Sequence, residues 1–124
     1  MSNTTIYEVS EIRLDAKRFS KLKDILAEYI EKTLGVRPRT VKLRYGLGYA
    51  FYFKGKTFTV RLMGDGRVEL AIDTWGMTAN EINTVRKAFN ESAIAADYIV
   101  SAEEAGFLVE NVEFVKEEVE VGVL

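Results

Sequence analysis

The fold is decided by residues 40–73, which read TVKLRYGLGYAFYFKGKTFTVRLMGDGRVELAID. Apolar and polar residues alternate within this stretch, and a period of two is typical of strands with one buried face. Glycine-containing turns divide it, and the Asp65-Gly66 pair is favoured in tight hairpins because both residues tolerate positive φ. We therefore predict a meander of four antiparallel strands, over residues 40–45, 49–53, 57–63 and 67–73.

Two amphipathic helices are predicted on either side of the meander. The first follows Asp15, an N-cap residue, and ends before Gly35. The second begins after a capping-box pattern formed by Thr78 and Glu81. A similar pattern at Ser101 leaves two alternatives, a helix that breaks there and restarts or one that runs through. The apolar positions at helical spacing are Phe19, Leu22, Leu26, Tyr29 and Ile30 in the first helix and Ile82, Val85, Phe89, Ala93, Ala96 and Val100 in the second.

The ends of the chain complete the expected fold. Residues 6–14 are predicted to form a first strand. Residues 107–115 and 118–123 alternate Val or Phe with Glu, which indicates a closing hairpin with one acidic, solvated face. The order β-α-β-β-β-β-α-β-β predicts a single α+β domain over residues 1–124, with both helices packed on one face of a mainly antiparallel sheet.

Composition excludes several kinds of chemistry. The chain has 124 residues, of which 48% are hydrophobic, and it contains no Cys and no His. Disulfides, cysteine nucleophiles, Cys/His zinc sites and imidazole acid–base steps are therefore excluded. No stretch approaches the roughly 18 apolar residues that a membrane helix needs, and the first residues are polar. We expect a soluble, cytoplasmic protein with no membrane partner, no cofactor and no catalytic activity.

The charge is distributed unevenly along the chain. The net charge is −2, but residues 36–67 carry eight Lys and Arg against the single acid Asp65. Residues 98–124 carry seven Glu against Lys116 alone. Such asymmetry bears on association rather than on fold.

The basic segment suggests a binding face. If Val41, Leu43 and Tyr45 point inward, alternation places Lys42 and Arg44 outward, and Arg61 of the third strand joins them. An aromatic, cationic sheet face is typical of proteins that bind single-stranded nucleic acid. The simpler interpretation, which we favour, is a solvated sheet face. The residues of this candidate face are Lys42, Arg44, Tyr52, Lys54 and Arg61.

The acidic segment suggests a partner surface. Glu117, Glu118 and Glu120 of the closing hairpin, with the neighbouring apolar surface, are predicted to bind a protein partner or a second copy. The alternative is that the hairpin lies beside the central strands and its glutamates neutralise them within one molecule, at about 0–1 kcal/mol for each exposed pair.

Three further residues near the end of the meander, Trp75, Glu69 and Asp73, are candidates for a contact or a metal site. Trp75, at a strand end, either anchors the core, which we favour, or forms an exposed contact. Glu69 and Asp73 lie on the same side of one strand, about 13 Å apart at about 3.3 Å per residue. That spacing is too long for a tight pair of metal ligands, so we interpret both as part of a solvated face.

Parts of the chain resemble a known family. These are the aromatic-rich strand and Lys54-Gly55-Lys56 turn within residues 49–76, residues 68–73 leading to Trp75, and Ala105-Gly106-Phe107 before the Glu-rich hairpin. They resemble a small cyanobacterial and red-algal plastid family that is catalogued as a domain of unknown function. The resemblance implies the order of the elements and supplies no activity, cofactor or catalytic residue.

Taken together, these patterns predict a small non-catalytic binding or accessory protein. A protein-interaction or self-associating module is the first hypothesis. A nucleic-acid-binding protein that uses the basic, aromatic sheet face is the alternative.

Overall fold

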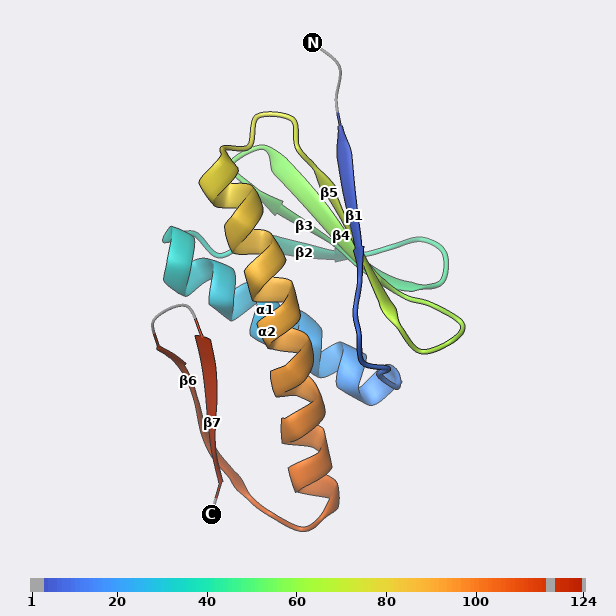
Figure 1. Cartoon of the computed structure of the whole chain (residues 1–124), viewed down its shortest axis with the longest axis vertical. Coiled ribbons are helices and arrows are strands. Elements are labelled where there is room, and N and C mark those ends of the chain that lie inside the picture. The colour runs from blue at the N-terminus through green and yellow to red at the C-terminus, as the bar shows by residue number, and fades with distance from the viewer. Residues whose placement is uncertain (1–3, 116–117, 124) are drawn as a thin grey trace.

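The computed structural model describes residues 4–115 and 118–123. The chain forms β1 (Thr5–Val9), α1 (Ala16–Leu34), β2 (Arg39–Lys42), β3 (Leu47–Phe53), β4 (Lys56–Leu62), β5 (Val68–Asp73), α2 (Ala79–Glu104), β6 (Val109–Val115) and β7 (Glu118–Val123). The first five strands make one antiparallel sheet in the order β1-β5-β4-β3-β2, and β6 and β7 make a separate ribbon. Figure 1 shows α1 and α2 together on one side of the sheet, with the ribbon against the helices. The predicted α+β order is confirmed.

The core lies between the sheet and the helices. Phe51, Phe58 and Ile72 are partners across three neighbouring strands and are almost completely buried. The Phe51 and Phe58 rings stack with their centroids 4.7 Å apart. Because side chains alternate along a strand, this row places every second residue of the meander under the helices and the others on the opposite face.

Helix α1 has the predicted ends and the predicted buried face. The Asp15 side chain accepts a hydrogen bond from the backbone N–H of Arg18 at 2.8 Å, and Gly35 ends the helix with a φ of 75°. The Phe19 ring packs on Tyr49 of β3, 5.6 Å between centroids. All five of the predicted apolar positions are buried.

Helix α2 runs unbroken past Ser101, and its first turn is attached to the sheet. Thr78 and Glu81 form the predicted capping box. The Glu81 carboxylate also accepts hydrogen bonds from the Lys56 ammonium at 2.7 and 2.8 Å, and both side chains are largely buried. Arg86 pairs with Glu8 of β1 one turn further along. These two ion pairs connect the N-terminal part of α2 to the central strand β4 and to the edge strand β1.

Arg18 joins the two helices to each other. Its guanidinium, which is largely buried, donates to Asp15 at 2.7 Å, Asp97 at 2.9 Å and Glu104 at 2.5 Å. It also donates to the Ser101 hydroxyl at 2.9 Å. One side chain of α1 therefore contacts two turns of α2, and three of its four partners lie far away in sequence.

Strand β1 is shorter than the predicted strand over residues 6–14. The Ser10 hydroxyl accepts a hydrogen bond from the backbone N–H of Val68 and donates to the carbonyl of Ile12, both at 2.8 Å. A side chain thus takes the place of the next backbone acceptor in the ladder, and the chain leaves the sheet after Val9. The alternation of residue types in the sequence does not reveal that the Ser10 hydroxyl replaces a backbone acceptor.

The Lys56–Glu81 pair makes stability depend on pH. Hydrogen bonds from the Lys56 ammonium and from the backbone N–H of Thr78 lower the pKa of Glu81 below its usual 4.5. A lowered native pKa contributes stability above the unfolded value, and this contribution is lost as the pH falls through the native value. We expect Glu81→Gln to lose about 1–3 kcal/mol of unfolding free energy at pH 7, and we expect this deficit to shrink as the pH falls below 4.5.

Urea unfolding across this pH range measures the effect. Glu28→Gln is the matched control, because Glu28 is exposed on α1 and, within the described part of the chain, forms no ion pair. A Glu81→Gln deficit of the same size at pH 3 and pH 7 would contradict the assignment.

Candidate interaction surfaces

One face of the five-stranded sheet carries no helix, and we call it the open face. Its central row crosses all five strands in register, in the order Tyr7, Ala71, Thr59, Ala50 and Val41. Small residues occupy the three inner strands, and larger apolar residues stand at the two edges. Tyr7 is 64% exposed. The row therefore has small side chains at its centre and an exposed aromatic side chain at one edge.

Charged residues of both signs border this row. Arg61 and Glu69 are register partners on β4 and β5, and within the described residues neither side chain forms an ion pair. On the other side of the row, the Arg39 guanidinium lies over the Tyr52 ring, 4.8 Å from its centroid. Asp73 of β5 is the fourth charged residue beside the row. The open face therefore carries a balanced charge.

The predicted basic face is wrong. Lys42 is the register partner of Tyr49, whose ring packs on α1, so Lys42 lies on the helix side of the sheet and Arg61 on the open face. Arg44 lies beyond the end of β2, over the Tyr45 ring at 5.7 Å. The prediction failed because β2 is a short edge strand whose side chains are mostly exposed on both faces, and burial then does not specify the phase.

The two remaining residues of that set have separate positions. Lys54 is in the two-residue turn between β3 and β4, where its φ of 49° and the 74° of Gly55 match a type I′ turn. Tyr52 points to the open face. Of the five predicted residues, only Tyr52 and Arg61 share the open face, on opposite sides of its central row, and Arg39 lies there beside Tyr52.

Trp75 is exposed, so the favoured prediction that it anchors the core is wrong. Its side chain is 57% exposed in the loop between β5 and α2. The backbone N–H of Trp75 donates to the Asp73 carboxylate at 3.1 Å, and Gly76 turns the chain with a φ of 73°. This turn directs the chain into α2 and leaves the indole outside both layers.

The acidic hairpin does not join the central strands. β6 and β7 pair only with each other, and they pack against α2, so the alternative in which the glutamates neutralise the basic segment from within the sheet is wrong. Glu120 is exposed and directly opposite Glu113 in register. Glu117 and the side chain of Glu118 lie outside the described residues.

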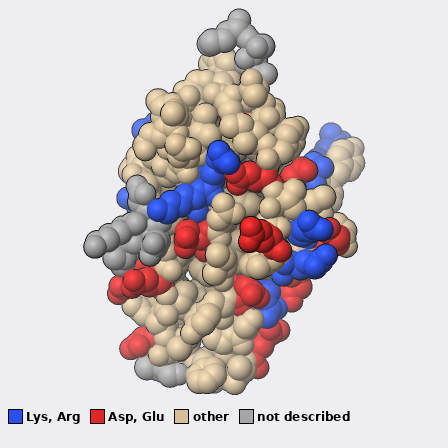
Figure 2. Space-filling view, viewed as in Figure 1, with Lys and Arg blue, Asp and Glu red and all other residues tan. Residues whose placement is uncertain are grey.

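A groove runs between α2 and β7. Two hollows of about 250 and 290 Å³ lie along it, and Tyr98 lines both. Large apolar side chains stand exposed beside them: Ile94 is 60%, Tyr98 52% and Phe107 55% exposed. Figure 2 shows an uncharged strip over this part of the molecule, with acidic side chains on both sides and Lys and Arg among them on the right.

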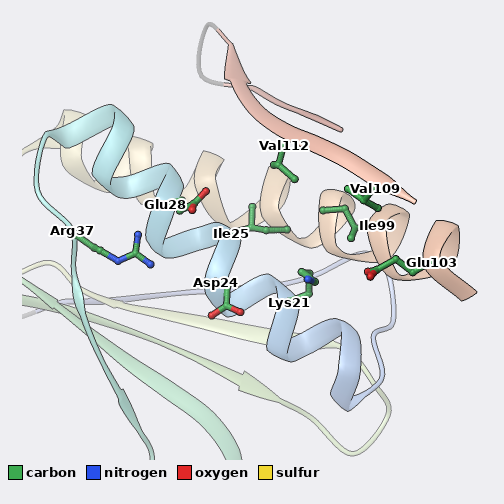
Figure 3. Close-up of a pocket in the computed structure, with 9 residues that line it drawn as sticks. All are labelled: Lys21, Asp24, Ile25, Glu28, Arg37, Ile99, Glu103, Val109 and Val112. Atoms are coloured by element: carbon green, nitrogen blue, oxygen red, sulfur yellow. The ribbon is translucent and has the colours of Figure 1, made fainter. Parts of the chain in front are cut away.

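A larger hollow of about 520 Å³ lies behind the ribbon, among α1, α2 and β6 (Figure 3). Its buried lining residues, Ile25 and Ile99, are apolar, whereas the charged side chains around it are at the surface or half-buried. It has no buried polar group of the kind that orients a small ligand. Among the described residues, no three carboxylates lie close enough together to hold a metal ion.

Sequence reasoning missed the exposed residues of α2. The buried positions of this helix include Val85, Phe89, Ala96 and Val100. Ile94 and Tyr98, four residues apart, fall outside that stripe. A second apolar stripe on a helix whose first stripe is already complete is the signal that would have identified them.

No helix in the described part of the chain is long and apolar enough to cross a membrane.

Comparisons of the chain with protein-family models, with curated proteins and with solved structures find no match. The resemblance to the cyanobacterial and plastid family stays a prediction. Function is therefore inferred from the geometry and chemistry of these surfaces.

The position of Trp75 is testable by fluorescence, because it is the only Trp of the chain. A solvated indole emits at long wavelength and is accessible to quenchers. We expect acrylamide to quench the native protein nearly as strongly as the urea-unfolded protein, with little shift of the emission maximum on unfolding. A blue-shifted, protected native indole would show that Trp75 is in the core.

Proposed function

We propose that this protein is a non-catalytic protein-interaction module that associates with a second copy of itself through the open face. The observation that carries the proposal is the helix-free face of the sheet, whose central row ends in exposed Tyr7 and Val41, with half-buried Ala71 and Thr59 and buried Ala50 between them. Exposed apolar surface of this kind is typical of interaction sites, and sheets commonly bury such faces against another layer.

A two-fold axis between β4 and β5, parallel to the strands, gives a complementary arrangement. It places β4 over β5 of the second copy and β1 over β3 of the second copy, since the strand order is β1-β5-β4-β3-β2. Tyr7 then lies over the small side chains at the centre of the row, on β3 of the partner subunit. Face-to-face sheets pack about 10 Å apart, which leaves room for one layer of side chains from each copy.

The same axis pairs the free charges. Arg61 of one copy lies over Glu69 of the partner subunit, and the reverse contact forms by symmetry. Both charges lack an ion pair within the described part of the monomer, so the dimer satisfies groups that the monomer leaves free. An isologous interface requires this kind of self-complementary surface.

The charge balance of the open face does not favour nucleic acid. Phosphate binding requires an excess of Lys and Arg along one surface. Here Arg39 and Arg61 are accompanied by Glu69 and Asp73, and the remaining cations of the predicted set lie elsewhere.

Charge reversal tests this dimer. We expect the wild type to dimerise in sedimentation over a protein concentration series from about 1 µM to 1 mM, and Arg61→Glu and Glu69→Arg each to be monomeric at concentrations where the wild type is dimeric. The mixture of the two variants restores association, because Glu at 61 of one copy then faces Arg at 69 of the other, while the second contact keeps the native pair of Glu69 and Arg61.

The matched controls are Lys17→Glu and Glu28→Arg, which make the same kinds of change at exposed positions of α1. Both are expected to dimerise like the wild type. The proposal is overturned if the wild type stays monomeric over the series, or if the mixed variants associate no better than each one alone.

A further inference from the structure

We propose that the groove between α2 and β7 binds an amphipathic helix with positively charged flanks, presented by another protein. This inference goes beyond the self-association of the open face. The two surfaces share no residue, so a result that contradicts one proposal leaves the other unaffected.

The first argument is the apolar content of the groove. Tyr98 stands between the two hollows, with Val119 and Val121 of β7 at one and Val123 at the other. Ala95, Ala102 and Ala105 give the α2 side a floor of small residues. Small residues beside exposed large ones leave recesses into which apolar side chains of a partner fit.

The second argument is the spacing of the hollows. Along α2, one extends from Glu91 to Tyr98 and the other from Tyr98 to Ala105. Their midpoints are about seven residues apart, or about 10 Å at 1.5 Å per residue. Positions i and i+7 of a partner helix have the same separation, whereas alternate residues of a strand are only about 7 Å apart. The spacing favours a helix, with positions i+3 and i+4 over Tyr98.

The third argument is charge. Residues 88–124 contain nine Asp and Glu and a single Lys. Glu103 and Glu104 lie in the last turn of α2, which contains no basic residue, and the dipole of a helix is negative at this end. Arg18 pairs with Glu104, and Glu103 lines the hollow behind the ribbon, whereas Glu91 lines the groove itself at the first of its two hollows. The uncharged strip with acidic borders in Figure 2 thus fits a partner with an apolar stripe and Lys or Arg beside it.

Charge also separates this occupant from a second copy. Two copies that met groove to groove would bring two acidic borders together, which is unfavourable. A cationic partner relieves the same repulsion.

A synthetic peptide probe tests the groove. The probe is a fluorescent peptide of about 18 residues, with Leu at helical spacing i, i+3, i+4 and i+7 and Lys at the flanking positions. One control peptide has the same composition in a scrambled order without the stripe, and another has Glu in place of Lys. Anisotropy titration with the full chain is expected to show binding of the Leu/Lys probe and at least about tenfold weaker binding of both controls.

Two variants locate the binding. Tyr98→Ser and Ile94→Ser remove exposed side chains, and each is expected to weaken the Leu/Lys probe about tenfold or more. Tyr7→Ser is the matched control on the open face: it is expected to keep peptide binding and to weaken dimerisation in sedimentation, whereas the groove variants do the opposite. Equal binding of the scrambled peptide, or wild-type affinity in both groove variants, would overturn the inference.

Discussion

The burial of one face of the meander under two helices is the constraint on which the rest of the structure depends. Phe51, Phe58 and Ile72 form a buried row across three strands, and a strand allows only every second residue to share that side. A slip of one residue would expose these side chains and bury Arg61 and Glu69. The core thus decides which residues remain on the open face.

The helix layer then separates the two candidate surfaces. Lys56 and Glu81 attach the first turn of α2 to the sheet, and Arg18 holds α1 to the C-terminal half of α2. The open face lies on one side of this layer, and the groove beside β7 lies on the other (Figure 1). The two surfaces differ in chemistry: the first is balanced in charge and complementary to itself, and the second is apolar with an acidic border. We infer that one small domain presents two independent interaction sites.

The accuracy of the sequence predictions follows how strongly local contacts specify each element. Asp15, Gly35 and the Thr78–Glu81 capping box act within a few residues, so the helix ends were predictable. The phase of β2 was not, because an edge strand exposed on both sides gives no burial signal. The placement of the closing hairpin was not predictable either, since its apolar face can cover a helix as readily as extend a sheet. The groove exists because the hairpin packs against α2. The sequence therefore indicated the acidic residues of the hairpin but not the apolar groove beside it.

Proximity at the centre of the open face tests the account most directly. The chain has no Cys, so a Thr59→Cys variant carries a single thiol beside the proposed two-fold axis, and Ser20→Cys carries one on the exposed surface of α1. Treatment with a short bismaleimide crosslinker, followed by denaturing electrophoresis, measures how often two thiols meet. The account predicts rapid covalent dimer formation for Thr59→Cys and little for Ser20→Cys. Equal, slow crosslinking of both variants at a concentration where the protein is dimeric would contradict it.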